Sequence, residues 1–169
     1  MLDTLITSKT RLKLLIKFFV SSANRGYLRG LAEEFNESTN AIRKELNQLS
    51  DAGYLLKSQQ LNKILYQANT AHPLFNSLQN LVRTYLGVDG LVDIVLERSG
   101  KVQQVSLLGD YARGIDSGTI ELLILGESLD SVYLLQLSEK MEGILNKKIK
   151  LYLEKPNDFL EQIVLYKLE

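Results

Sequence analysis

The sequence ESTNAIRKELNQLSDAG, residues 37–53, carries apolar side chains at helical spacing with polar side chains between them. Ile42, Leu46 and Leu49 follow one another at intervals of four and three residues, which places them on one face of a helix. At about 100° per residue, the opposite face carries two amides, a guanidinium and an ammonium group, from Asn40, Arg43, Lys44 and Asn47. We therefore expect an amphipathic helix that is anchored through aliphatic side chains and presents hydrogen-bonding groups on its other face.

This predicted helix has a start signal and a stop signal. Ser38 or Thr39 can cap its first turn, because a hydroxyl oxygen accepts a hydrogen bond from a free backbone N–H group there. Gly53 suits the left-handed conformation in which many helices end. The polar face is typical either of a solvated helix in any small domain or of a helix that contacts base edges and phosphates. The neighbouring segments favour the second interpretation.

Two amphipathic segments precede this helix in the sequence. Residues 8–21 have the apolar spacing of a helix, with Ser8 at the N-cap position, and residues 27–35 form a shorter one. The turn residues of SSANRG, at 21–26, separate the two. A short helix at 27–35, a tight connection and the helix at 37–53 make the helix-turn-helix pattern.

Two strand-like runs follow Gly53. Residues 54–57 and 63–67 are rich in apolar and aromatic side chains, and the polar residues 58–62 join them. This order predicts a β-hairpin. Three helices followed by a hairpin predict a winged helix.

Residues 8–86 resemble the ArsR-like and MarR-like winged-helix regulators of transcription. AGYLL, at 52–56, resembles the junction between recognition helix and wing in those proteins, and NTAHPL, at 69–74, resembles their exit from the wing. The resemblance implies that residues 38–49 enter the major groove of double-stranded DNA and that residues 58–63 lie along the backbone or minor groove. Some members of such families are protein-interaction modules without DNA binding, and this alternative stays open.

The predicted DNA contacts divide by chemistry. Guanidinium and amide groups can bond a base edge with two hydrogen bonds, and the groups on the polar face are those of Asn40, Arg43 and Asn47. Hydroxyl and ammonium groups near the helix start are expected to hold phosphates, and these belong to Ser38, Thr39 and Lys44. Two lysines beside the hairpin tip add positive charge, Lys57 and Lys63.

Composition narrows the classes of function. A chain of 169 residues with 45% hydrophobic and 24% charged residues suits one folded domain or two small ones. It has no cysteine and one histidine, His72, which argues against a disulfide framework, a thiolate nucleophile and a histidine zinc site. His72 is expected to be a cap or a surface residue. Without a long apolar run, we expect a cytoplasmic protein with no membrane partner.

The formal net charge of +0 conceals an asymmetry between the two parts of the chain. Residues 1–70 hold ten Lys or Arg and six Asp or Glu, a net charge of +4. Residues 71–169 hold ten Lys or Arg and fourteen Asp or Glu, a net charge of −4. A basic first part and an acidic second part favour a nucleic-acid-binding module joined to a domain of another kind.

The predicted domains are residues 1–70, the winged helix, and residues 88–169, a second domain. A helix reaching from His72 to about Leu86 connects them across 71–87, with Pro73 at its first position. Its apolar face could pack within the chain or form the seam of a homodimer. Gly87-Val88-Asp89-Gly90 is interpreted as a boundary.

The second domain is predicted to alternate helices and strands, which favours an α/β sandwich. The expected helices are residues 91–98, 131–145 and a last short one that begins at 156–158; the expected strands are residues 102–108, 119–125 and 149–153.

LLGDYARGIDSGTIELLI, residues 107–124, resembles the minimal nucleotidyltransferase domain of the DNA polymerase β superfamily. Ala112-Arg113-Gly114 and the strand after it match that family's motif, and the resemblance covers roughly residues 88–162. It implies a nucleotide site at Gly109, Asp110, Arg113, Thr119 and Glu121.

The chemistry of that family needs carboxylates that hold two metal ions, and most of them are replaced. Thr119 and Glu121 stand at the two aspartate positions of the strand, and the third aspartate falls near Lys150. Asp110 replaces the serine that follows the family's glycine. We therefore expect a degenerate, non-catalytic site without metal or cofactor, in which Arg113 forms an ion pair with Asp110, Asp116 or Glu121.

Together these patterns predict an α+β chain with an N-terminal winged helix and a nucleotidyltransferase-like domain. The main hypothesis is a homodimeric, DNA-binding transcriptional regulator whose second domain serves dimerisation or senses an unknown small-molecule or nucleotide effector. Two alternatives remain: an active nucleotidyltransferase of toxin–antitoxin type, and a protein-interaction adaptor that does not bind DNA.

Overall fold

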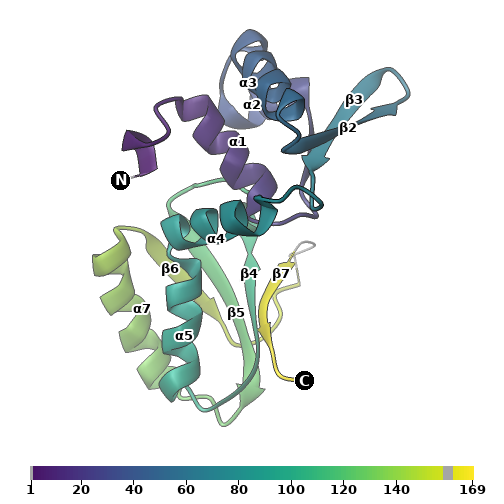
Figure 1. The fold of residues 1–169 in the computed structure, drawn as a ribbon. Coiled ribbons are helices and arrows are strands. Elements are labelled where there is room, and N and C mark those ends of the chain that lie inside the picture. The colour runs from purple at the N-terminus through teal and green to yellow at the C-terminus, as the bar shows by residue number, and fades with distance from the viewer. Residues whose placement is uncertain (1, 158–161) are drawn as a thin grey trace. The chain divides into compact units, whose positions relative to one another are not determined.

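The computed structural model describes residues 2–157 and 162–169. The chain divides into two compact units, Met1–Val82 and Arg83–Glu169. Both contain helices and a sheet, so the expected mixed α+β class is confirmed (Figure 1). In the described part of the chain, no helix is long and apolar enough to cross a membrane.

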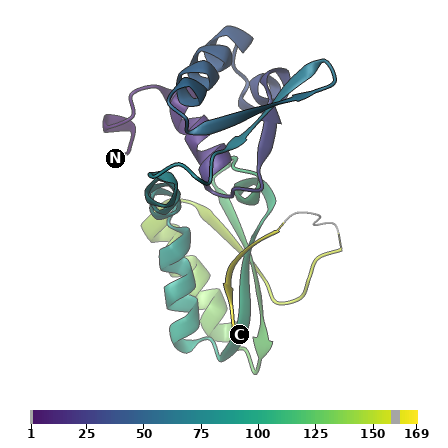
Figure 2. The same cartoon turned by 45° about the vertical axis from the view of Figure 1, so that its right-hand side comes forward.

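The first unit places three helices beside a small antiparallel sheet. Strand order in this sheet is β1-β3-β2, and β2 and β3 form a hairpin that projects from the helices (Figure 2). The elements are the 3-10 helix η1 (Leu2–Thr4), α1 (Lys9–Phe19), β1 (Arg25–Tyr27), α2 (Leu28–Phe35), α3 (Thr39–Asp51), β2 (Leu55–Gln60) and β3 (Lys63–Ala68). Helix α4 (Phe75–Leu86) follows and contains the division between the two units.

Local signals explain most boundaries of the helices in this unit. Ser8 caps α1 by accepting a hydrogen bond from the Arg11 backbone N–H at 3.1 Å, as predicted. Asn36 ends α2 in the left-handed conformation, with φ of 53°. Gly53, with φ of +81°, ends the turn after α3 in a conformation that glycine adopts without steric cost.

The hairpin is longer than expected. Residues 58–62 were predicted as its tip, but β2 continues to Gln60, and Gln60 pairs with Lys63. This leaves Leu61 and Asn62 as a two-residue turn. The prediction was wrong because both faces of the outer hairpin are exposed, so its strands lack the alternation of apolar and polar residues that marks a half-buried strand.

Two further predictions in this unit need correction. The helix expected from Tyr27 begins at Leu28, because residues 25–27 form β1 and pair with β3, Arg25 opposite Gln67. The helix expected from His72 begins at Phe75, and Pro73 precedes it. His72 lies in the turn before this helix, where its Nδ1 accepts a hydrogen bond from the Leu74 backbone N–H at 3.1 Å.

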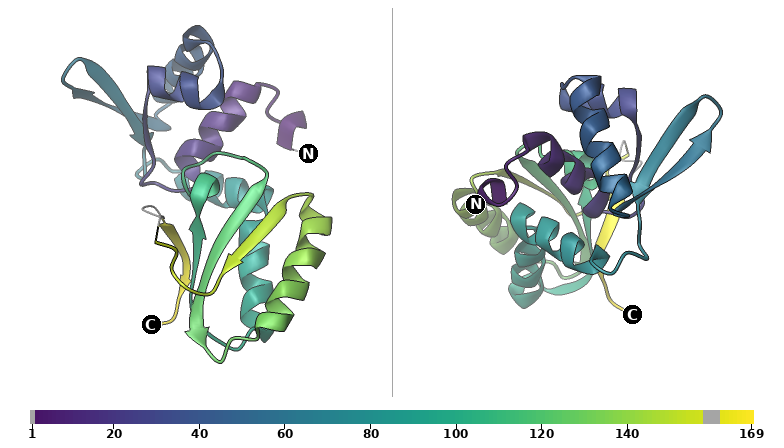
Figure 3. Two further views of the ribbon diagram at one scale, coloured as in Figure 1. Left: turned by 180° about the vertical axis from the view of Figure 1, so that it is seen from behind. Right: turned by 45° about the horizontal axis from the view of Figure 1, so that its top comes forward.

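The second unit is built on a four-stranded sheet with strand order β6-β5-β4-β7. Strands β5 and β6 run parallel, and β4 is antiparallel to both β5 and β7. Helices α5 and α7 lie side by side on one face of the sheet (Figure 3). The elements are α5 (Val88–Arg98), β4 (Lys101–Leu108), α6 (Gly109–Ala112), β5 (Thr119–Glu127), α7 (Ser131–Leu145), β6 (Lys148–Tyr152) and β7 (Gln162–Lys167).

The ends of this unit differ from the prediction. The stretch 87–90, interpreted as a boundary, contains the start of α5, and Gly87 precedes that helix with φ of 76°. The last short helix was expected to begin at 156–158. Residues 156 and 157 are not helical, and residues 158–161 lie outside the described part of the chain. The chain then forms β7, whose Gln162 pairs with Leu108 of β4.

Candidate functional site

Helix α3 has the two faces that its sequence predicts. Ile42 and Leu46 are fully buried, and Leu49 is buried beside them. The Ser38 hydroxyl caps the helix by accepting a hydrogen bond from the Ala41 backbone N–H at 3.2 Å, so Ser38 rather than Thr39 is the N-cap. All six predicted contact residues of this segment are exposed: Ser38, Thr39, Asn40, Arg43, Lys44 and Asn47.

A concave surface of about 870 Å³ lies between α2, α3 and the hairpin, and we call it the α3–hairpin groove. Its lining includes three cationic side chains, Arg29, Arg43 and Lys63, and one carboxylate, Glu33. The other lining residues are Tyr27, Leu28, Gly30, Asn47, Asn62, Ile64 and Tyr66. The charged side chains therefore make the groove net positive.

The structure brings together part of the predicted DNA-binding set. Arg43 and Asn47, one helical turn apart, share the α3–hairpin groove with Lys63 of β3. Ser38, Thr39, Asn40, Lys44 and Lys57 are exposed outside its lining. Arg29 was not among the predicted contact residues. The apolar spacing of residues 28, 31, 32 and 35 nevertheless places its side chain on the outer face of the helix.

Arg43 is held only lightly in the groove. Its Nη1 donates to the Asn40 Oδ1 at 3.3 Å, a long hydrogen bond between exposed side chains. Burial raises the pKa of the Tyr66 hydroxyl, and the nearby positive charge of Arg43 opposes that rise. The guanidinium thus keeps most of its five N–H donors for a ligand.

Lys63 is oriented by an aromatic ring of the neighbouring strand. Its Nζ lies 5.5 Å from the centroid of the Tyr27 ring, within the range of a cation–π contact. The Tyr27 hydroxyl donates a hydrogen bond to the Gln60 Oε1 at 2.8 Å. Tyr27 therefore ties both strands of the hairpin to the edge of the groove.

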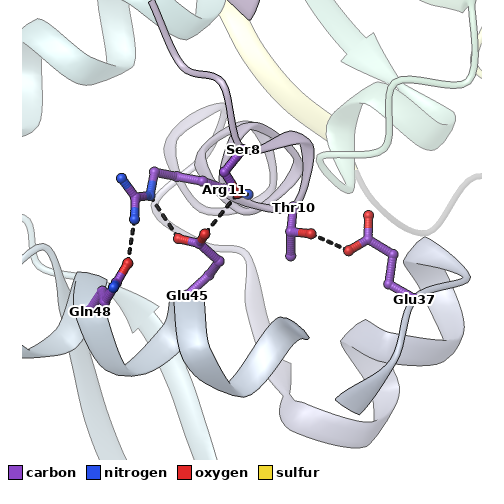
Figure 4. A network of polar contacts seen from close by, with 6 residues as sticks. All are labelled: Ser8, Thr10, Arg11, Glu37, Glu45 and Gln48. Atoms are coloured by element: carbon purple, nitrogen blue, oxygen red, sulfur yellow. Dashed lines mark hydrogen bonds and ion pairs between the residues drawn. The ribbon is translucent and has the colours of Figure 1, made fainter. Parts of the chain in front are cut away.

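A polar network joins α1 to α3 on the side away from these contacts (Figure 4). The Glu45 carboxylate is buried on α3 and accepts hydrogen bonds from the Ser8 hydroxyl at 2.7 Å and from the Arg11 Nε at 2.7 Å. Arg11 also donates to Gln48, one turn further along α3. These bonds fix the rotation of α3 about its axis, which decides where Arg43 points.

A second part of the network holds the start of α3. The Thr10 hydroxyl donates a hydrogen bond to one carboxylate oxygen of Glu37 (Figure 4). The Lys13 ammonium group donates to the other carboxylate oxygen at 2.7 Å. Burial alone would raise the pKa of Glu37, but these two hydrogen bonds and the charge of Lys13 outweigh it, so the pKa is lowered. Glu37 is therefore charged at neutral pH.

In the second unit, the residues of the predicted degenerate nucleotide site contact one another and their neighbours. Arg113 forms its ion pair with Asp110, the first of the three expected partners. Glu121 of β5 lies opposite Lys150 of β6, with Lys150 Nζ 4.0 Å from its carboxylate. The Tyr152 hydroxyl donates to the same Glu121 oxygen at 3.0 Å.

These residues do not fit the metal ions that the resembled family uses. Thr119 offers a hydroxyl in place of a carboxylate, and Lys150 brings a cation to the place of a third ligand, where it repels metal. Across the described residues, no three or more His, Cys, Asp or Glu side chains form a group that could hold a metal ion.

An unpredicted cluster holds the loop between α6 and β5. Lys147 Nζ lies 3.3 Å from the Asp116 carboxylate and 5.0 Å above the Tyr111 ring centroid. The Tyr111 hydroxyl, which is fully buried, donates to Asp116. Burial and the Asp116 carboxylate raise the pKa of Tyr111 far above its ordinary value. The cluster therefore holds the loop before β5 to the residues that begin β6.

Comparison with known proteins gives structural neighbours only. No protein-family model matches the chain, and no curated protein matches it. Two mutant forms of the toxin–antitoxin MntA-HpeT are similar over 48% of this chain, at 17% and 18% identity and a TM-score of 0.42, covering 72% and 73% of their own chains. A toxin–antitoxin crystallised with AMP-PNP is similar over 48% of this chain and 75% of its own, at 17% identity and a TM-score of 0.41.

The three neighbours are toxin–antitoxin proteins. The similarity extends over about half of this chain. At such scores it assigns no activity to the chain, and the residues of the two units carry the functional argument.

Proposed function

We propose that the first unit is a winged helix that binds double-stranded DNA and that the chain regulates transcription. The observation that supports this most is the α3–hairpin groove, in which Arg43, Asn47 and Lys63 converge on one concave, net positive surface. Helix α3 would enter the major groove, where guanidinium and amide groups distinguish base pairs by their donor and acceptor patterns.

The division of contacts follows from position on α3. Arg43 and Asn47 lie in the groove and are assigned to base edges, with Asn40 beside Arg43. Ser38 and Thr39 stand at the helix start, where free backbone N–H groups and the helix dipole favour a phosphate. The exposed lysines, Lys44, Lys57 and Lys63, add phosphate contacts, which position the protein without reading sequence.

The test is selection of duplexes from random DNA, followed by anisotropy titrations of the selected duplex over a series of salt concentrations. We expect affinity to fall steeply with salt, because phosphate contacts release counterions. Arg43→Ala with Asn47→Ala should cost about 1–3 kcal/mol for each base contact and relax the selected sequence.

Arg98→Ala with Gln136→Ala makes a matched control, since both residues are exposed and lie in the second unit. This control should bind like the unmodified chain. Absence of binding at low salt, or site-specific binding that survives the loss of Arg43 and Asn47, would contradict the proposal. If the chain is instead an adaptor that does not contact DNA, binding should be absent even at low salt.

For the second unit we propose a role without nucleotidyl transfer, in dimerisation or in sensing an effector. The support is that Glu121 is engaged by Tyr152 and Lys150 and that Asp110 is engaged by Arg113. A homodimer would set two recognition helices about one DNA turn apart, which multiplies specificity. Sedimentation equilibrium of the full chain, with and without DNA, tests the dimer.

An active nucleotidyltransferase of toxin–antitoxin type is the second candidate. The observation in its favour is Glu121, a carboxylate on β5 where the resembled family holds a metal ligand. Metal-dependent consumption of a nucleoside triphosphate, abolished by Glu121→Gln, would establish it. If the unmodified chain and Glu121→Gln consume the triphosphate at equal rates, this second candidate is excluded.

A further inference from the structure

Glu33 differs from the other glutamates of the first unit in its electrostatic surroundings. The other three, Glu34, Glu37 and Glu45, each form an ion pair with a cation of α1 at 2.7 to 2.8 Å. Glu33 lies on the outer face of α2 and lines the α3–hairpin groove, as does Arg29 one turn earlier. Among the described residues that line this groove, Glu33 is the only carboxylate.

This carboxylate is unpaired although three cations line the same groove. Within the described part of the chain, Glu33 forms no ion pair and no hydrogen bond through its side chain. Its negative charge repels the DNA phosphates that Arg29, Arg43 and Lys63 attract. A hydrogen-bond donor on the ligand is the group that suits an exposed, unpaired carboxylate in a cationic groove.

The groove also holds a guanidinium that is available to the same ligand. Arg43 of α3 makes one long hydrogen bond, to Asn40 at 3.3 Å. In the major groove, a G·C base pair presents the N7 and O6 acceptors of guanine beside the N4 amino donor of cytosine. A guanidinium beside a carboxylate offers the complementary order, donors followed by an acceptor. An A·T pair presents its donor between two acceptors and does not fit this order.

We propose that Glu33 and Arg43 together read one G·C base pair in the major groove. The Arg43 guanidinium donates to guanine N7 and O6, and the Glu33 carboxylate accepts from the N4 amino group of cytosine. Helix α2 is then a second reading element beside α3. The carboxylate also weakens binding to other sequences, because it meets no donor there and repels phosphate. This inference rests on the proposed DNA binding of the first unit.

The first test locates the base pair by selection from random DNA. Arg43→Ala should lose the preference for guanine at one position, and Glu33→Ala should weaken the preference for G·C at that same position only. Glu33→Ala should bind unrelated duplexes equally or more tightly, since a repelling charge is removed. Glu139→Ala, at an exposed glutamate of α7, is the control for loss of charge and should select the same site as the unmodified chain.

The second test removes the hydrogen-bond donor from the DNA. In the selected duplex, the cytosine of this pair is replaced by a pyrimidinone that lacks the N4 amino group. Affinity of the unmodified chain should fall about five- to thirty-fold more than affinity of Glu33→Ala, because the variant has already lost the contact. Equal losses for the two chains would show that Glu33 does not contact this amino group.

The outcomes separate this proposal from the one it rests on. If the unmodified chain selects no duplex, the proposed function fails and the reading role of Glu33 fails with it. If the chain selects a site and Glu33→Ala changes no position of it, DNA binding stands and only the role of Glu33 is wrong. A loss of affinity for all duplexes alike, with a lowered melting temperature, would assign Glu33 to the stability of α2 and would also overturn the inference.

Discussion

Arg11 of α1 and Glu45 of α3 form an ion pair at 2.7 Å, with the Glu45 side chain 9% exposed and that of Arg11 39% exposed. The pair joins α1 to α3 through two residues that are 34 positions apart in the sequence. The Ser8 hydroxyl also donates a hydrogen bond to Glu45. The carboxylate is therefore held both by the N-cap residue of α1 and by a residue of its first turn. The orientation of the exposed polar face of α3 therefore depends on a contact on the opposite side of the helix.

Arg11→Ala should lower the free energy of unfolding of the first unit by about 2 kcal/mol, because it leaves a buried carboxylate with one partner fewer. Urea unfolding followed by circular dichroism measures this. Lys9→Ala, at an exposed lysine of the same helix, is the control and should change stability by less than about 0.5 kcal/mol. Equal effects of the two substitutions would contradict the assigned role of Arg11.

Stability of the first unit should decline in acid through Glu37. Its folded pKa lies below the ordinary value of 4.5, so the folded state favours the charged carboxylate. The resulting stabilisation is present above pH 4.5 and is lost as the pH falls through the folded pKa. Carboxyl titration by NMR should show Lys13→Ala raising the pKa of Glu37. An unchanged pKa in that variant would show that Lys13 does not act on Glu37.

The two lysines of the hairpin should affect DNA binding without affecting sequence choice. Lys57→Ala and Lys63→Ala should each reduce the slope of log affinity against log salt by about 1, as expected for one lost phosphate contact. The selected sequence should stay the same, since a phosphate contact carries no base information. A change of preferred sequence in either variant would assign that lysine to a base edge.

Tyr152 reports on the surroundings of Glu121 in the second unit. Burial raises the pKa of its hydroxyl, and the hydrogen bond to Glu121 and the negative charge of Glu121 raise it further. Glu121→Gln should therefore lower the pKa of Tyr152 towards 10.0 while leaving the part that burial causes. Ultraviolet titration of tyrosinate, compared with Tyr152→Phe to identify the signal, measures the shift. A pKa that stays the same would mean that Glu121 is not paired with Tyr152 in solution.

Prediction from the sequence succeeded where neighbouring residues carry the signal. The buried and exposed faces of α3 follow from spacing over two or three turns, and its cap follows from a hydroxyl three residues before Ala41. It failed at β7, Gln162–Lys167, where no strand was predicted although the segment carries aliphatic and aromatic residues typical of one. It also failed at the hairpin tip, where pairing between exposed strands leaves no apolar alternation.

Local spacing was sufficient for α3 and for its exposed polar residues, because both depend on residue types at short separations. Three-dimensional packing was needed to place Lys63 in the same groove as Arg43, to bury Glu45 against Arg11 and to isolate Leu61 at the tip of a two-residue turn. These features join residues far apart in the chain or depend on strand register, and both arise only when the helices and strands pack together.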